Sequence, residues 1–412
     1  MYSFIDLFAG CGGLSEGFLS TNKYKGVAHV EWELPMVNTL RNRLVTKWDH
    51  TLEDAEKRVI HFDIQKTEEL IEGDWSEEAV QEFSITNHID IVEKGINGLI
   101  ENKTVDIIIG GPPCQAYSIH GRAKDKNSMK DDYRNYLFES FVKLVDQYKP
   151  KIFVFENVPG ILTAKPGGVN ITERIFESFD NINYKILKPD ELPNAIFDVV
   201  NYGVAQSRKR VIIIGINKDS NFELEDIYSI IRSKQNLNNK ITVLDSIADL
   251  PKLSPLKENI KIKGKNISHS CDKESELLQH SPRYHNKRDL NIFKEWIING
   301  MNYCSQKEKI DYYYRKTGKT TLYAKYKNLE WNKPSHTIVA HLQKDGLMFI
   351  HPDPEQSRSI TIREAARLMS FPDDYKFLGS NAKCYKMIGN AVPVKFSRII
   401  AESISEFLTN KY

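Results

Sequence analysis

The chain has 412 residues, of which 41% are hydrophobic and 27% charged, and its formal net charge is +2. This length exceeds the roughly 250–300 residues at which single hydrophobic cores stop growing, so we expect two domains. No run of about 18 apolar residues occurs and no cleavable leader follows Met1, which argues against a membrane protein and favours a cytoplasmic one.

The first half of the chain alternates short apolar runs with segments of helical spacing. Residues 135–148 have the apolar spacing of a helix that begins after Asp131 or Asp132. The runs that are typical of strands lie at residues 4–8, 26–31, 105–111, 151–158 and 210–216. This alternation predicts an α/β fold with a doubly wound sheet.

A glycine-rich turn follows the first strand, in DLFAGCGGLSEGF at residues 6–18. Glycines at such a turn let the backbone approach a ligand, and an acidic residue about 20 positions later commonly holds a ribose. Glu31 has that position, Trp32 could cover an adenine ring, and Asp63 could accept from the adenine amino group. The turn therefore predicts a nucleoside-containing cofactor. The GKT at 318–320 lacks the glycine of a phosphate loop and indicates an ordinary basic loop.

The run at 105–111 leads into GGPPCQAYS, which places Cys114 at the carboxyl end of a strand, where open α/β sheets hold their chemistry. The remaining cysteines form no CxxC pair with it or with each other, which argues against a zinc site and a disulfide framework, and we expect no metal. They are Cys11, Cys271, Cys304 and Cys384.

Three further charged residues lie at strand ends. Glu156 follows the apolar run KIFVF, and Arg208 and Arg210 precede VIIIG. Methylation of cytosine at carbon 5 requires a nucleophile that adds at carbon 6, an acidic group at ring nitrogen 3 and positive charge nearby. Cys114 could supply the nucleophile, Glu156 the acidic group, and the two arginines the positive charge.

After residue 215 the alternating pattern of apolar runs ends, and the sequence becomes irregular and rich in lysine and asparagine. Residues 217–335 contain 22 Lys and Arg against 15 Asp and Glu, a net charge of +7 that leaves −5 on the remainder. This asymmetry suggests a basic module on a neutral or acidic body. We predict one discontinuous domain, 1–220 with 380–412, and a second at 221–379.

Taken together, DLFAGCGG, GGPPCQAYS, ENV, QSRKR, TIREAARLMSFP and GNAVP occur in an order that resembles the cytosine-5 DNA methyltransferase family, in its bacterial restriction–modification form. The resemblance runs nearly end to end. It implies a Rossmann-like methyltransferase fold with a mixed sheet, a C-terminal helix folded back against the first strand, and a smaller irregular target-recognition domain at 221–379.

The same resemblance implies the activity and its partners. The enzyme would transfer a methyl group from S-adenosylmethionine to carbon 5 of a flipped cytosine in a specific duplex DNA sequence, through a cysteine adduct at carbon 6, with S-adenosylhomocysteine as second product. A cognate restriction endonuclease would act on the same site. We expect a monomer in the bacterial cytoplasm, associated with the nucleoid.

Site residues follow from the resemblance position by position. Cys114 is the nucleophile, Glu156 assists at nitrogen 3, and Arg208 and Arg210 contact the flipped base or its surroundings. The implied cofactor pocket comprises Phe8, Gly10, Cys11, Gly12, Gly13, Leu14, Glu31, Trp32, Asp63, Ile64, Pro112, Leu137, Asn390 and Val392. The implied DNA contacts are Gln115, Ser118, Arg122 and Arg134, in or beside a polar segment suited to closing over the phosphate backbone.

Three alternatives stay open. A transfer-RNA cytosine methyltransferase would share the catalytic residues, although the long basic segment favours duplex DNA. A nicotinamide-dependent dehydrogenase would explain the glycine turn and Glu31 but leaves Cys114 and Glu156 without roles. A non-catalytic DNA-binding protein would be expected to lack both. The long acidic segment at 66–104 has no assigned role, and the recognised DNA sequence cannot be deduced.

Overall fold

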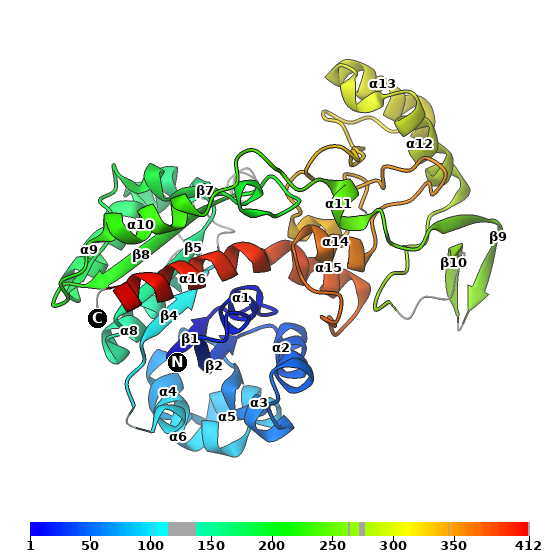
Figure 1. Cartoon of the computed structure of the whole chain (residues 1–412). Coiled ribbons are helices and arrows are strands. Elements are labelled where there is room, and N and C mark those ends of the chain that lie inside the picture. The colour runs from blue at the N-terminus through cyan, green and yellow to red at the C-terminus, as the bar shows by residue number, and fades with distance from the viewer. Residues whose placement is uncertain (102, 114–136, 263, 272–276, 345, 411–412) are drawn as a thin grey trace. The chain divides into compact units, whose positions relative to one another are not determined.

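The computed structural model describes residues 1–101, 103–113, 137–262, 264–271, 277–344 and 346–410. The chain forms two compact units (Figure 1). The first contains residues 1–202, 208–237 and 391–412, and the second contains residues 203–207 and 238–390. These borders lie at Leu237 and Ala391, whereas the predicted domains met near residues 220 and 380; the roles predicted for the two domains stay predictions.

One mixed sheet organises the first unit. Its strand order is β3-β2-β1-β4-β5-β8-β6, with β7 also paired to β8. The strands from β3 to β5 run parallel, and β8 is antiparallel to β5, β6 and β7. The strands are β1 (Tyr2–Leu7), β2 (Tyr24–Glu31), β3 (Val59–His61), β4 (Ile107–Gly110), β5 (Ile152–Asn157), β6 (Tyr184–Lys185), β7 (Ile196–Asp198) and β8 (Lys209–Asn217). The predicted mixed α/β fold is confirmed.

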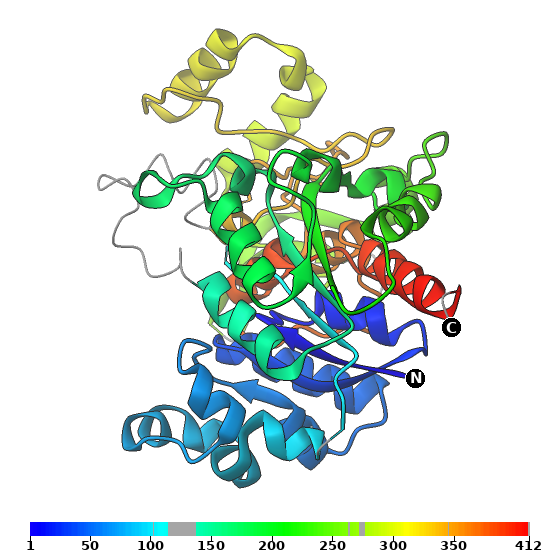
Figure 2. The same cartoon turned by 90° about the vertical axis from the view of Figure 1, so that its left-hand side faces the viewer.

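Helices cover both faces of this sheet, which explains why its central strands are apolar along their length rather than alternating. Figure 2 shows α16 and α10 on one face and α8 and α9 on the other. The helices of these layers and of the first crossovers are α1 (Gly13–Leu19), α2 (Leu34–Lys47), α3 (Leu52–Arg58), α8 (Leu137–Tyr148), α9 (Ile171–Asn181), α10 (Leu224–Ser233) and α16 (Val394–Asn410).

The C-terminal helix α16 returns to the start of the chain. It packs on α1, the helix that follows β1, and Tyr24 at the start of β2 donates a hydrogen bond to the Ala401 carbonyl at 2.6 Å. We predicted contact with the first strand itself; α16 packs on α1 and α10, and a hydrogen bond joins it to β2. Within the described chain, no helix is both long and apolar enough to cross a membrane.

The acidic segment at 66–104 folds into short helices, α4 (Thr67–Glu72), α5 (Glu77–Phe83), the 3-10 turn η1 (Ser84–Thr86) and α6 (Ile89–Ile100). It closes the free edge of the sheet at β3. The Asn87 side chain donates to the His61 carbonyl at 2.8 Å and accepts from the His61 N–H at 2.9 Å, in place of a neighbouring strand. The Phe62 and Trp75 rings pack with centroids 4.3 Å apart.

The second unit combines a two-stranded antiparallel ribbon, β9 (Leu253–Ile262) and β10 (Lys265–Cys271), with short helices. The TIREAARLMSF motif contains α14, capped by Thr361 and Glu364. The helices are α11 (Val243–Ile247), α12 (Lys287–Ile298), α13 (Gln306–Thr317), α14 (Ile362–Leu368) and α15 (Asn381–Asn390), with η7 (Met301–Tyr303) and η8 (Ala340–Gln343) between them.

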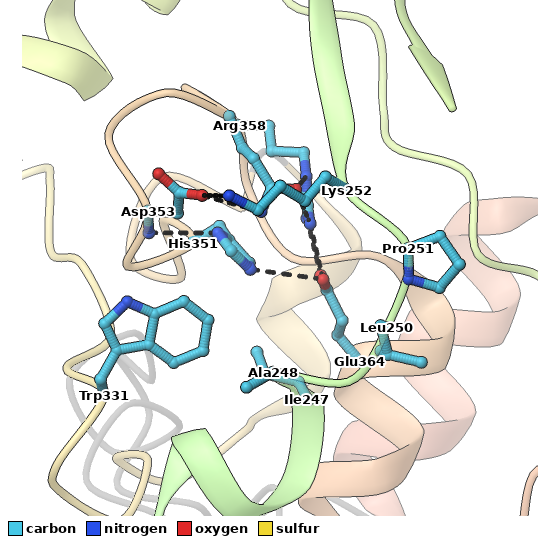
Figure 3. A pocket seen from close by; sticks show the side chains of 11 residues that line it. Ile247, Ala248, Leu250, Pro251, Lys252, Trp331, His351, Asp353, Arg358 and Glu364 are labelled. Atoms are coloured by element: carbon cyan, nitrogen blue, oxygen red, sulfur yellow. Dashed lines mark hydrogen bonds and ion pairs between the residues drawn. The ribbon is translucent and has the colours of Figure 1, made fainter. Parts of the chain in front are cut away.

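A cavity of about 220 Å³ lies in the second unit beside α11 and α14 (Figure 3). Its charged residues pair with one another: Arg358 binds both oxygens of Glu364 at 2.6 and 2.7 Å, and Lys252 lies 3.7 Å from Asp353. None of the predicted site residues that the structure describes lines it. Because these charges are already paired, we assign the cavity a structural role at the start of α14.

Candidate functional site

The glycine turn after β1 is held by the end of β2. One Glu31 carboxylate oxygen accepts the Gly10 N–H and the other accepts the Glu33 N–H, both at 2.8 Å. Phe8 adopts a left-handed backbone conformation with a φ of 58°, which is uncommon for a side chain of this size. Burial raises the pKa of the Glu31 carboxyl, although its backbone hydrogen bonds oppose that shift. A strained turn and a partly buried acid thus meet at one strand edge.

The other predicted cofactor residues of this region gather at the same edge, because β1, β2 and β3 are adjacent and parallel. Trp32 follows Glu31 and is 44% exposed. Asp63 lies two residues after β3, is half-buried, and accepts the Gln65 N–H at 3.0 Å. His61 joins the Trp32 carbonyl to Thr86 at 2.7 Å each, so the inserted helices help to hold this edge. Cys11, Gly12, Gly13, Leu14 and Ile64 are buried beneath it.

The chain returns to the glycine turn through residues 391–392. A Cβ added to Gly13 would lie 2.5 Å from the Val392 carbonyl oxygen, so only glycine permits this approach. The buried Arg208 donates from Nη2 to the Ala391 carbonyl at 3.0 Å. Arg208 therefore connects the start of β8 to the backbone that covers the turn. Asn390 ends α15 and belongs to the second unit.

A second cluster forms where β4, β5 and β8 meet. Glu156 on β5 forms an ion pair with Arg210 on β8, Nε to Oε1 2.6 Å, and each side chain is 12% exposed. A Cβ on Gly111 would lie 2.7 Å from Glu156 Oε2, so the carboxylate rests against the backbone that leaves β4. The neighbouring Asn157 donates to the Pro112 carbonyl at 3.3 Å. Glu156 and Asn157 thus hold the segment that runs directly to Cys114.

Several predicted residues lie outside the part of the chain that the structure describes. These are Cys114, Gln115, Ser118, Arg122 and Arg134, with the possible helix caps Asp131 and Asp132. Leu137, the first described residue after this gap, is buried at the start of α8. No group of three His, Cys, Asp or Glu side chains suited to a metal ion occurs among the described residues.

A buried polar chain beneath the glycine turn was not predicted. Ser15 on α1 lies 2.5 Å from Asp6 Oδ2 on β1 and 2.8 Å from His29 Nδ1 on β2, and all three side chains are fully buried. Burial raises the pKa of Asp6 to about 7 and lowers that of His29 to about 3. The signal was available, because Asp6 and His29 interrupt apolar strand runs that should face a core.

A known protein family matches nearly the whole chain. The family model of the C-5 cytosine-specific DNA methylase matches residues 2–74 and 67–406. The chain belongs to the C-5 cytosine-specific DNA methylase family. It is therefore a DNA cytosine-5-methyltransferase, and the predicted family, enzyme class and methyltransferase fold are confirmed.

Relatives agree with this membership of the methylase family, and a solved structure shares the fold. A type II methyltransferase of Bacillus paralicheniformis, M.Bpa9945I, is 36% identical, with 99% of each chain covered. The type II methyltransferase M1.HphI of Haemophilus parahaemolyticus is 28% identical over 99% of this chain and 88% of its own. A putative prophage-encoded DNA modification methyltransferase from Escherichia coli has the same fold, with a TM-score of 0.62 at 22% identity over 99% and 100% of the two chains.

Proposed function

We propose that this methyltransferase uses S-adenosylmethionine to methylate a cytosine that has left a specific duplex DNA sequence, through a covalent bond between Cys114 and carbon 6. The observation that carries the proposal is the place of Glu156. Its carboxylate contacts Arg210 and lies against Gly111, three residues before Cys114 in the sequence. Glu156 thus lies beside the segment that leads to Cys114 in the sequence, and an acid together with a thiol is what addition to a cytosine ring requires.

The predicted cofactor residues fit a nucleoside. Each Glu31 oxygen accepts one backbone N–H and keeps a second lone pair, so each can also accept a ribose hydroxyl. The exposed Trp32 indole lies beside it at the strand end, where an adenine ring could stack. When bound, S-adenosylmethionine would supply an electrophilic methyl group and leave as S-adenosylhomocysteine.

The chemistry of the chain's own residues follows from their positions. The target base must leave the helix, as in other methyltransferases that act on DNA bases. The Cys114 thiolate would form a bond to carbon 6 while Glu156, once protonated, would give its proton to ring nitrogen 3, so that carbon 5 becomes nucleophilic. After methylation, a base would remove the proton of carbon 5, and the electron pair of that bond would restore the double bond between carbons 5 and 6 and expel the thiolate. The proton on nitrogen 3 would return to Glu156. Arg210 holds the Glu156 carboxylate in place.

We assign Arg208 a positioning role. Its guanidinium is buried and bonds the Ala391 carbonyl, and the next carbonyl, that of Val392, lies against Gly13. Arg208 would therefore act on the cofactor through the glycine turn rather than by contact with the cytosine. Replacing Arg208 should weaken cofactor binding more than it lowers the rate of methyl transfer at saturating cofactor.

The substitution Cys114→Ser tests the nucleophile. We expect it to abolish methyl transfer to DNA while cofactor affinity stays within a few-fold of the wild type. A duplex containing 5-fluorocytosine should trap a covalent adduct with the wild-type protein alone, because fluorine on carbon 5 blocks the proton loss that releases the enzyme. Appreciable turnover by the serine variant would overturn the assignment. Methyl transfer to transfer RNA is measured in parallel, because a transfer-RNA cytosine methyltransferase would share the same nucleophile.

We further propose a restriction endonuclease that cuts the same sequence, and a monomeric enzyme in the cytoplasm that acts at the nucleoid. The type II designation of the relatives supports the endonuclease, whereas the monomeric state and the location rest on the sequence prediction. Bisulfite sequencing of DNA from a host that expresses the protein identifies the methylated cytosine. That DNA should then resist the proposed endonuclease, and cleavage in spite of methylation would exclude a shared site.

A further inference from the structure

A short turn in the second unit, residues 318–325, presents an apolar side chain to solvent. Gly318 ends α13 in a left-handed conformation, with its N–H bonded to the Tyr314 carbonyl at 2.8 Å. The Thr321 hydroxyl then donates to the Tyr323 carbonyl at 2.9 Å and accepts the Tyr323 N–H at 3.3 Å. These local bonds leave Leu322 at the tip, 91% exposed.

The turn stands on a packed base. Tyr312 precedes it on α13 and Tyr326 follows it, and both are buried in one cluster around Trp296. The ring centroids of Tyr312 and Tyr326 lie 5.6 and 5.5 Å from that of Trp296. Figure 1 shows α12 and α13, which supply much of this cluster, side by side. Leu322 is therefore held in its exposed position by an ordered base on both sides of the turn.

Basic residues flank this apolar tip in the sequence. Between Asp311 and Glu330 the sequence contains five basic residues and no acidic one: Arg315, Lys316, Lys319, Lys325 and Lys327. Lys316 is paired with Glu295 at 2.5 Å, and Lys325 Nζ lies 4.2 Å above the Tyr323 ring. Lys319, the second residue of the turn, is exposed.

We propose that the 318–325 turn is a DNA-contact element, with Leu322 placed against the bases of a groove and Lys319 and Lys325 on the flanking phosphates. An apolar wedge between base steps, flanked by lysines, is how architectural proteins enter a groove. A protein partner fits less well, since lysine is depleted at protein interfaces. The proposal rests on the DNA substrate of the family and needs no step of the Cys114 chemistry.

The first test is Leu322→Ala, with Ile85→Ala as matched control because Ile85 is 93% exposed in the first unit. We expect Leu322→Ala to weaken binding of a duplex carrying the methylated sequence by about five- to thirtyfold, with an unchanged melting temperature and unchanged S-adenosylmethionine affinity. The control should bind the duplex like the wild type. A 2-aminopurine beside the contacted step should brighten with the wild type and not with Leu322→Ala.

The second test uses salt dependence, which reports phosphate contacts. The double variant Lys319→Gln, Lys325→Gln should reduce the slope of log Kd against log salt by about two, because each phosphate contact contributes roughly 0.9. Lys103→Gln with Lys149→Gln, two exposed lysines of the first unit, should leave the slope unchanged. Wild-type affinity and slope in both turn variants would overturn the proposal. So would self-association that disappears with Leu322→Ala, since the turn would then join two copies of the chain.

These measurements separate the inference from the proposed chemistry. Binding is measured without turnover, whereas the covalent step is tested by the 5-fluorocytosine adduct. If the wild-type protein forms the adduct but the turn variants bind DNA like the wild type, only the proposed DNA contact is wrong. If the wild-type protein forms no adduct but the turn variants bind DNA more weakly, only the assignment of Cys114 as nucleophile is wrong.

Discussion

Asp6, Ser15 and His29 form a buried chain with two hydrogen-bonding arrangements, which differ by one proton on Asp6. With Asp6 ionised, Ser15 donates to the carboxylate and accepts from His29 Nδ1–H. With Asp6 protonated, the carboxyl donates to Ser15, which donates to His29 Nδ1. The distances of 2.5 and 2.8 Å suit both. Because burial raises the pKa of Asp6 to about 7, the two arrangements exchange near neutral pH.

This pKa predicts how stability changes with pH. A raised pKa in the folded state means that the contribution of Asp6 is fully present below its ordinary pKa near 4 and is lost as pH rises toward 7. Asp6→Asn keeps a donor toward Ser15 and removes the titration. We therefore expect the stability of Asp6→Asn relative to the wild type to increase by roughly 2–3 kcal/mol between about pH 5 and about pH 8.

Urea unfolding at the two pH values measures this difference. Asp146→Asn is the control, because Asp146 is exposed on α8 and its removal should give the same difference at both pH values. A stability difference for Asp6→Asn that does not move with pH would mean that Asp6 stays ionised throughout.

Glu31 is a second residue for which the observed hydrogen bonds lead to a testable prediction. Both of its oxygens already accept backbone N–H groups, so Glu31→Gln would turn an amide NH₂ toward one of these donors. Charge-assisted hydrogen bonds contribute roughly 1.5–3 kcal/mol each, so we expect S-adenosylmethionine affinity to fall by about ten- to a thousandfold. Calorimetric titration measures the affinity, and single-turnover rates at saturating cofactor should change much less. An unchanged dissociation constant would place the ribose site elsewhere, nearer Asp63.

At the scale of elements, the start of α14 depends on a buried ion pair. Burial alone would raise the pKa of Glu364, but the charge of Arg358 and of its neighbours lowers it to about 2. The pair therefore stabilises the fold above the ordinary glutamate pKa and loses this contribution as pH falls toward 2. Glu364→Gln leaves Arg358 buried without a counter-charge, and we expect a loss of about 3–5 kcal/mol at neutral pH.

The matched control is Glu402→Gln on α16. Glu402 pairs with Arg398 one helical turn away at the surface, Nε to Oε1 2.8 Å, so its removal should cost less than about 1 kcal/mol. Chemical unfolding at neutral pH compares the two variants. Equal effects would show that the pair at α14 is as solvated as the surface pair.

The elements that the sequence predicted are those with long apolar runs. All five predicted strands are present. Strands that are buried on both faces of the sheet form continuous apolar runs, which are easy to identify in the sequence. The strands β6 and β7 have two and three residues and are too short to show any period. The helix α13 was missed in the basic segment although Ser305 and Glu308 form a capping box, a signal that the sequence offers.

The candidate site divides in the same way. The positions of Glu156 at a strand end and of the glycine turn after β1 could be predicted because strand ends and turn chemistry are local. The contact of Arg208 with the Ala391 carbonyl joins residues 183 positions apart, and that of Asn157 with the Pro112 carbonyl joins residues 45 apart. Hydrogen bonds to backbone carbonyls at such separations leave no pattern in one sequence, so these positioning contacts required the fold.

At the scale of the whole molecule, charge follows the two compact units more closely than it follows the predicted boundary. Residues 238–390 contain 26 Lys and Arg against 17 Asp and Glu, a net charge of +9, which leaves −7 for the rest because residues 203–207 are uncharged. A basic unit attached to an acidic one is suited to attract DNA through one part only. This distribution supports a target-recognition role for the second unit, which remains a prediction.

Exchange of that unit tests the prediction. Replacing residues 238–389 with the aligned segment of the Bacillus paralicheniformis relative keeps Asn390, a predicted cofactor residue, and also Ala391 and Val392, so the contacts with Arg208 and Gly13 are retained. Residues 203–207 belong to the second unit, and Ser207 donates its N–H to the Ser335 carbonyl at 2.8 Å, so a second chimera should exchange them as well. We expect both chimeras to yield 5-methylcytosine in a different sequence context, measured by bisulfite sequencing of host DNA, with S-adenosylmethionine affinity unchanged. The second should be the more stable because it keeps the Ser335 contact within one parent. A folded chimera that still methylates the original sequence would place sequence recognition in the first unit.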